Sequence, residues 1–186
     1  MVKLVDTRDL KSLGFCCASS SLASSIITSL LPKNYIAGGV RHSMVLLNIL
    51  KYPDEKLKNP SETVVKFDNN IVKLINDMFE TMYFNKAIGL AATQVDIHKQ
   101  LIVIESSKTK VVLVNPVLLE GSGKDYSEEA CLSIPNIVGF VVRTKSICIG
   151  TFDVKGYMYR IKANGILSIC IQHEVEHLFG FLNIYR

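Results

Sequence analysis

The segment from about Asn164 to Phe179 predicts a helix that lies inside the protein rather than on its surface. Asn164 is a suitable N-cap residue, and Gly180 is a suitable residue to end a helix. The apolar side chains lie nearly all round the helix axis instead of along one stripe, which is typical of a buried helix. They are Ile166, Leu167, Ile169, Cys170, Ile171, Val175, Leu178 and Phe179. Other elements must therefore pack around this helix.

The same segment carries His173 and His177, with Glu174 between them. Positions i and i+4 lie on one helical face, so the two imidazoles can point at a single ion, with Glu174 beside them to move a proton. Burying these polar side chains is costly unless each has a partner, and a metal ion with a bound water supplies such partners. A lone buried histidine is more often a hydrogen-bonded core residue than a ligand. Here, however, two of only four histidines form the pattern, which indicates a metal site.

A third metal ligand has to come from upstream, because no His, Asp, Glu or Cys follows His177. Cys131 is the best candidate, since it lies in a polar, turn-prone stretch. His98 is an alternative, whereas Cys148 and Cys170 are typical of inert core packing. Two histidines and one cysteine leave a fourth position open for water, which is the arrangement of a catalytic rather than a structural site.

Local patterns predict the elements around the buried helix. From Asp68, a suitable N-cap, apolar residues recur at helical spacing as far as Met82. Pro116, Gly121 and Gly123 punctuate the sequence between β-branched runs of strand length. Strands are predicted at residues 101–104, 111–114, 137–142, 147–152 and 157–161, with a turn at 153–156. The fold class is therefore α+β, with mainly antiparallel strands packed around a buried central helix that carries the metal motif.

Composition and charge exclude several classes of function. No apolar run reaches the roughly 18 residues that span a bilayer, so no membrane partner is expected. Residues 1–43 carry five Lys/Arg and two Asp, which leaves residues 44–186 nearly neutral and without the basic stripe of a nucleic-acid-binding protein. The five cysteines lack the spacing of a disulfide framework, which indicates a reducing compartment.

Residues 1–43 differ from the rest of the chain, because they are rich in serine and show no sustained period. They are either a targeting segment, being basic and poor in acids, or upstream sequence from a start codon assigned too early, with Met44 as the true start. We favour the second interpretation. The predicted organisation is an unstructured leader or non-native extension at 1–43 and a catalytic domain at 44–186. The expected location is the cytoplasm, or an organelle if the leader is a transit segment.

Three short motifs, in a fixed order, resemble those of peptide deformylases. The family pattern Gly-φ-Gly-φ-Ala-Ala-x-Gln, in which φ is apolar, matches AIGLAATQ at Ala87–Gln94. Glu-Gly-Cys-Leu-Ser matches EACLS at Glu129–Ser133, and Gln-His-Glu-x-x-His matches QHEVEH at Gln172–His177. One such motif is weak to moderate evidence, whereas three in order over residues 44–186 are strong.

The resemblance implies a metal-dependent hydrolase that removes the N-formyl group from the N-terminal formyl-methionine of newly synthesised polypeptides and releases formate. By similarity, Cys131, His173 and His177 would bind one divalent metal ion. The family usually works with Fe²⁺, and one thiolate with two imidazoles also suits Zn²⁺, Ni²⁺ or Co²⁺.

The resemblance also implies roles for residues around the metal. Glu174 would act as the general acid and base, and the side-chain amide of Gln94 and the backbone N–H of Leu132 would stabilise the oxyanion. Glu129 would pair with Arg143 and hold the loop of Cys131.

Substrate contacts follow from the same resemblance. Gly89 would let the substrate backbone approach closely, and Ile88 and Ile169 would line an apolar pocket for the methionine side chain. The expected partners are N-formyl-methionyl nascent peptides. Many bacterial members continue beyond the position of Arg186 into a helix associated with ribosome docking, so the resemblance leaves ribosome association open.

Two residues depart from the family pattern, since Ala87 and Ala130 stand where the family has glycine. If either position needs a positive φ, alanine costs roughly 1 kcal/mol there. The alternatives are a catalytically impaired deformylase-like protein and a general zinc metallopeptidase. The complete set of ligands counts against the first, and the motif around Cys131 counts against the second.

Overall fold

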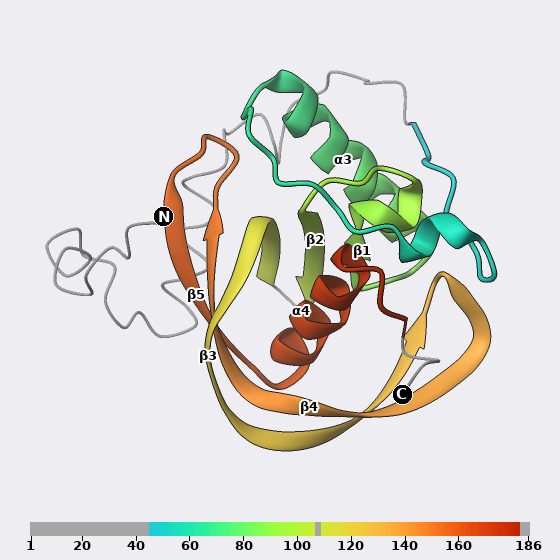
Figure 1. The fold of residues 1–186 in the computed structure, drawn as a ribbon, viewed down its shortest axis with the longest axis vertical. Coiled ribbons are helices and arrows are strands. Elements are labelled where there is room, and N and C mark those ends of the chain that lie inside the picture. Colours follow the sequence, from blue (N-terminus) through green and yellow to red (C-terminus); the bar gives the residue numbers. More distant parts are fainter. Residues whose placement is uncertain (1–44, 107–108, 183–186) are drawn as a thin grey trace, which may run out of the picture. The chain divides into compact units, whose positions relative to one another are not determined.

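Five strands form one antiparallel sheet in the order β1–β2–β3–β4–β5 in the computed structural model, which describes residues 45–106 and 109–182. The strands are β1 (Gly89–Ala91), β2 (Leu101–Ser106), β3 (Thr109–Cys131), β4 (Ile134–Phe152) and β5 (Met158–Asn164). Figure 1 shows β3 and β4 as one long curved ribbon that bends round the helix α4 (Gly165–Leu178). The predicted α+β class is confirmed. The predictions for residues 1–43 lie outside the described residues.

The strands β3 and β4 are longer than the sequence predicts. The strands expected at 137–142 and 147–152 are parts of the single strand β4. The interruption expected at Pro116, Gly121 and Gly123 is wrong, because β3 runs through all three residues. The register between β3 and β4 shifts between Val114 and Val117. This irregularity lets the pairing of the two strands continue past Pro116, which has no backbone N–H to donate. The predicted turn at 153–156 joins β4 to β5.

The helix α3 (Asn69–Phe84) begins where the sequence predicts. The carboxylate of Asp68 accepts hydrogen bonds from the backbone N–H groups of Asn70 (2.9 Å) and Ile71 (3.2 Å), which confirms it as the N-cap. The buried apolar face of α3 is Ile75, Met78, Phe79 and Met82, and the helix packs near β1 and β2. Two short 3₁₀ helices, η2 (Glu55–Lys58) and η3 (Ala92–Val95), lie before and after it in the chain.

The helix α4 packs into the main core from its middle to its last residue. Ile171 and Leu178 are buried there with Ile102 and Ile104 of β2 and Leu113 of β3. The prediction of burial all round is wrong at Ile166, which is 61% exposed in the first turn of α4, and at Phe179, which is 51% exposed and directly follows the helix. Among the described residues, no helix is both long and apolar enough to cross a membrane.

The end of α4 is fixed by its glycine, as the sequence predicts. Gly180 has a φ of 76°, and its N–H donates to the carbonyl of His177 while the N–H of Phe181 donates to the carbonyl of Glu176. The prediction for the start is right in position, but the Asn164 side chain makes no capping hydrogen bond within the described structure. Asn164 is also the last residue of β5, so the chain passes from strand to helix without a loop.

Candidate active site

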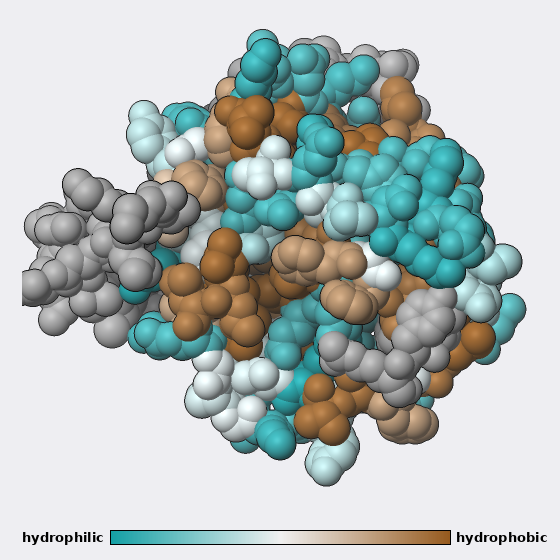
Figure 2. Space-filling model, viewed as in Figure 1, coloured by the Kyte–Doolittle hydropathy of each residue, from teal (hydrophilic) through white to brown (hydrophobic). Residues whose placement is uncertain are grey.

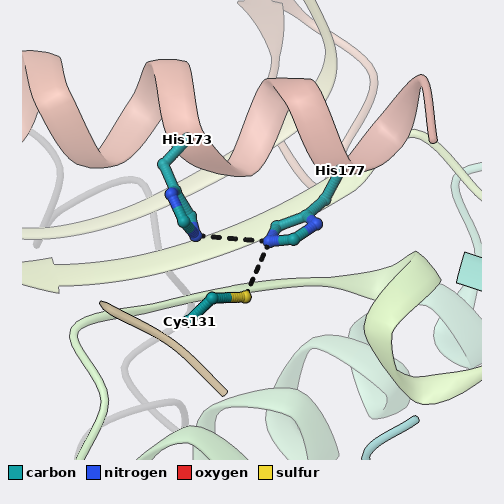
Figure 3. A group of neighbouring side chains, drawn as sticks. All are labelled: Cys131, His173 and His177. Atoms are coloured by element: carbon teal, nitrogen blue, oxygen red, sulfur yellow. Dashed lines mark hydrogen bonds between the residues drawn. The ribbon is translucent and has the colours of Figure 1, made fainter. Parts of the chain in front are cut away.

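Three potential metal ligands meet at the face of α4. Cys131 ends β3, and His173 and His177 lie one turn apart on α4, with all three side chains buried. The thiol faces the two imidazoles in Figure 3. Cys131 Sγ lies 3.2 Å from His177 Nε2, which lies 3.2 Å from His173 Nε2. The donor atoms all lie within 4.8 Å of one another, so they form a group that could hold one metal ion. His98, the alternative ligand, lies instead beside Asp96, 3.5 Å from its carboxylate.

A buried carboxylate orients the first histidine. The Nδ1–H of His173 donates to Glu129 Oε2 at 2.8 Å, which leaves Nε2 as the ring nitrogen that would bind a metal. Glu129 also accepts two hydrogen bonds from Arg143, both of 2.7 Å, so the pair expected from the family resemblance is present. Arg143 donates in turn to Glu176 at 2.6 Å. Two carboxylates and one guanidinium therefore join β3, β4 and α4 behind the ligands.

The charges of this group favour a cation. Burial opposes a charge on Glu129, but the hydrogen bonds from Arg143 and His173 outweigh it and lower its pKa to about 2. Burial also opposes a charge on His173, but its interactions with Cys131 and Glu129 raise its pKa to about 10. Burial is the main reason that the pKa of His177 lies well below its ordinary value, and the nearby charge of His173 lowers it further. Without a metal, the site therefore draws a proton onto His173. A divalent cation between the three donors would supply that positive charge instead, so these residues fit a metal ion.

Glu174 lies beside this group and is 5% exposed. Burial raises the pKa of its carboxyl to about 7. Its Oε2 atom has no hydrogen-bond partner among the described residues, which is costly for a buried polar atom. A carboxyl that is buried, unpaired at one oxygen and close to neutral in pKa is suited to exchanging a proton with a water or a substrate.

Gln94 has its side-chain amide directed by its own loop. Its Oε1 accepts a hydrogen bond from the backbone N–H of Ala91 at 2.9 Å. Of the two ends of the side-chain amide, only the oxygen can accept a hydrogen bond, so this contact fixes which end faces Ala91. Its Nε2 therefore faces the ligands, where it donates to Ser133 Oγ at 3.2 Å and to Cys131 Sγ at 3.6 Å. The bond to sulfur is the longer and weaker of the two.

A cleft of about 490 Å³ opens in front of these groups. Eight of the nine site residues predicted from the sequence line it. They are Ile88, Gly89, Gln94, Cys131, Leu132, Ile169, His173 and Glu174. The ninth, His177, does not line the cleft but contacts Cys131 and His173.

Figure 2 shows that the hydrophobic residues on one face of the molecule lie in separate patches among hydrophilic ones.

The structure also answers two questions that the sequence left open. Positive φ values at described non-glycine residues occur at four other positions, and neither Ala87 nor Ala130 is among them. Alanine therefore carries no left-handed strain at the two positions where it replaces a glycine of the family. Glu176, which we gave no role from the sequence, is the second partner of Arg143. Its place inside the histidine motif was visible, but nothing in the nearby sequence indicated that Arg143 of β4 would lie beside it.

Two histidines one turn apart, a facing cysteine and a buried carboxyl beside them are the arrangement typical of metal-dependent hydrolases. The comparison with known families narrows this class. The family model described as polypeptide deformylase matches residues 46–186. The chain therefore belongs to the polypeptide deformylase family, whose enzymes remove the N-formyl group from nascent peptides.

Curated relatives and solved structures agree with this assignment. A peptide deformylase of Neisseria meningitidis is 44% identical over 146 residues, covering 77% of this chain and 87% of the relative. One of Wigglesworthia glossinidia brevipalpis is 46% identical over 144 residues, covering 76% and 95%. The crystal structure of a peptide deformylase from Legionella pneumophila superposes with a TM-score of 0.73 at 37% identity, covering 76% of this chain and 85% of the other. That of a Synechococcus elongatus peptide deformylase in complex with actinonin gives 0.72 at 35% identity, covering 80% and 85%.

Proposed function

We propose that this chain hydrolyses the formyl group of N-formyl-methionyl peptides with one divalent ion held by Cys131 Sγ and the Nε2 atoms of His173 and His177. The observation that carries the proposal is the convergence of these three donors beside the buried Glu174 at the cleft. We propose Fe²⁺ as the ion by resemblance to the family, which usually works with Fe²⁺. One thiolate and two imidazoles suit Zn²⁺, Ni²⁺ and Co²⁺ as well, so the ligands alone do not choose between these ions. Ribosome association and a cytoplasmic location stay predictions from the sequence.

A metal ion held by Cys131, His173 and His177 would supply Lewis acidity, which would make a water easier to deprotonate near neutral pH. Glu174 takes the proton from the attacking water, since its unpaired Oε2 is available and its pKa lies close to neutral before a cation is added. The water oxygen bonds to the formyl carbon. When the carbon–nitrogen bond breaks, Glu174 gives the proton to the amine nitrogen of methionine. Formate and a free N-terminus are the products.

The negative charge on the formyl oxygen needs donors that are already in place. The Nε2–H of Gln94 that now points at Cys131 Sγ at 3.6 Å is weakly bonded, so the substrate oxygen would replace the sulfur as its acceptor. The backbone N–H of Leu132, in the turn after Cys131, would supply the second hydrogen bond. One such donor is commonly worth about 3 kcal/mol in the transition state.

The methionine side chain would enter the apolar part of the cleft. Ile88 and Ile169 line it together with Ile166 and Cys170. Burial raises the pKa of the Cys170 thiol to about 12, so this cysteine offers an apolar surface rather than a thiolate.

The test is turnover of a formyl-methionyl peptide by protein loaded with Fe²⁺ or Ni²⁺ without oxygen. We expect release of free amine and formate in equal amounts, and no cleavage of internal peptide bonds in the unformylated peptide. Cleavage at an internal bond would favour a general zinc metallopeptidase. A folded, metal-loaded protein without turnover would contradict the proposal and favour a catalytically impaired member of the family.

Replacing Gly89 by alanine is expected to displace Glu174. A Cβ atom at Gly89 would lie 2.5 Å from Glu174 Oε1 and 3.0 Å from its Cδ, so the glycine leaves room for the carboxylate as well as for a substrate. A misplacement of about 1 Å can cost on the order of 10²-fold in rate, and we expect a fall of that size in kcat. The measurement is steady-state deformylation with metal content determined alongside.

Gly150→Ala in β4 is the matched control for this change. Its added Cβ would meet Leu119 and Met158 at 3.4 Å and 3.5 Å, which are ordinary contacts. We expect this variant to keep its activity. Equal kcat values for Gly89→Ala and the wild type would show that the position of Glu174 is not needed for turnover.

A further inference from the structure

One short segment contacts both loops that carry the proposed oxyanion donors. The backbone N–H of Leu50 donates to the carbonyl of Gln94 at 2.8 Å. The backbone N–H of Tyr52 donates to the carbonyl of Ser133 at 2.8 Å. Between them, Lys51 Nζ donates to the carbonyl of Leu132 at 2.6 Å. Residues 50–52 lie outside the three family motifs, yet they join the first motif to the second.

The contact with the second motif falls on a tight turn. Leu132 and Ser133 are the two residues between Cys131 and Ile134, which pair across the end of the β3–β4 ribbon. Residues 50–52 bind both carbonyl oxygens of this turn. Each carbonyl shares a rigid peptide plane with the N–H of the next residue, so these bonds fix the planes on the far side of Leu132 and Ser133. The Leu132 N–H lies in the preceding plane, which is joined to the fixed plane at the Leu132 Cα, so holding the Leu132 carbonyl limits how far that N–H can turn.

The segment is itself anchored beneath the turn. Leu50 is 7% exposed and belongs to one buried cluster with Leu57, Cys131, Ile134 and Leu182. The same residue that donates to Gln94 therefore packs with the cluster that contains the cysteine ligand. In contrast, Lys51 is exposed and reaches the turn only with its side chain.

We propose that Lys51 is a positioning residue that holds the Leu132 turn in the orientation required of an oxyanion donor. This inference rests on the proposed function. The backbone bonds of Leu50 and Tyr52 fix the segment, and the Lys51 ammonium adds a hydrogen bond to the carbonyl of Leu132 itself. Because Lys51 is exposed, its removal should change stability little, which separates positioning from general support of the fold.

The experiment compares wild type with Lys51→Met, Lys51→Arg and the control Lys66→Met, an exposed lysine later in the same stretch. For Lys51→Met we expect kcat to fall on the order of tenfold. Removing a whole oxyanion donor commonly lowers kcat by about 10²–10³-fold, and here the Leu132 N–H is loosened rather than removed. KM, metal content and melting temperature should stay unchanged. Lys51→Arg should recover most of kcat, and Lys66→Met should match wild type.

A second readout does not depend on turnover. In the Zn²⁺-loaded protein, we expect the backbone amides of Leu132 and Ser133 to exchange with solvent several-fold faster in Lys51→Met than in wild type, as followed by NMR. Unchanged exchange, or a fall in kcat matched by an equal loss of metal or stability, would overturn the proposal. Faster exchange in a protein whose wild type does not deformylate peptides would sink the proposed function and, with it, the oxyanion role, while leaving the contact of Lys51 with the turn intact.

Discussion

Glu174→Gln is expected to lower kcat for deformylation by about 10³-fold or more while the protein keeps its metal. General acid–base catalysis by one positioned group commonly contributes about 10²–10⁴-fold, and Glu174 is proposed to move the proton in both halves of the reaction. Glutamine has the same shape but cannot accept and return that proton. The variant should fold, because burial already disfavours the charged form of this side chain. The measurements are kcat, metal content and melting temperature on the same preparation.

Glu128→Gln is the matched control for this change, since Glu128 is an exposed carboxylate that lines the same cleft. It should leave kcat within a factor of a few of wild type. If Glu174→Gln also keeps most of the activity, another group moves the proton. If it loses the metal together with activity, Glu174 supports the ligand set instead of the chemistry.

The helices and the ligand set were predictable because their signals are local. Each of these signals spans only one or two helical turns of sequence: the caps at Asp68 and Gly180, and the spacing of His173 and His177. Cys131 was the best candidate for the third ligand because of its polar, turn-prone surroundings and its motif, and the structure brings it to the two histidines.

The failures share a different cause, because they depend on residues far apart in the chain. Pro116 was expected to interrupt a strand, but the register shift against β4 that accommodates it is a property of two strands. Glu176 had no predicted role, since its partner Arg143 lies 33 positions away. Gly89 was assigned to the substrate, and its contact with Glu174 became visible only when β1 was placed against α4. Lys51, 81 positions from Leu132, carried no signal at all.

Arg143→Met is expected to lower the free energy of unfolding of the metal-free protein by about 3–5 kcal/mol, as for other broken buried ion pairs. Arg143 is 3% exposed and donates to the buried Glu129 and to the partly buried Glu176, so its loss removes the guanidinium from both carboxylates. We also expect metal affinity to fall by about 10–100-fold, because Glu129 would no longer hold His173 in position. Urea unfolding and competition with a chelator measure the two effects separately. A single variant as stable as wild type would contradict the assigned role of the ion pair.

The double variant Glu129→Gln with Arg143→Met separates these two roles. It removes the buried charge of Glu129 together with that of Arg143, so part of the lost stability should return, as when a whole buried ion pair is replaced. Metal affinity should not return, because a neutral amide at position 129 accepts the His173 Nδ1–H more weakly than a carboxylate does. Recovery of stability without recovery of affinity would show that the carboxylate serves the metal site rather than the fold. Recovery of both would show that Glu129 and Arg143 matter to the metal only because each compensates the buried charge of the other.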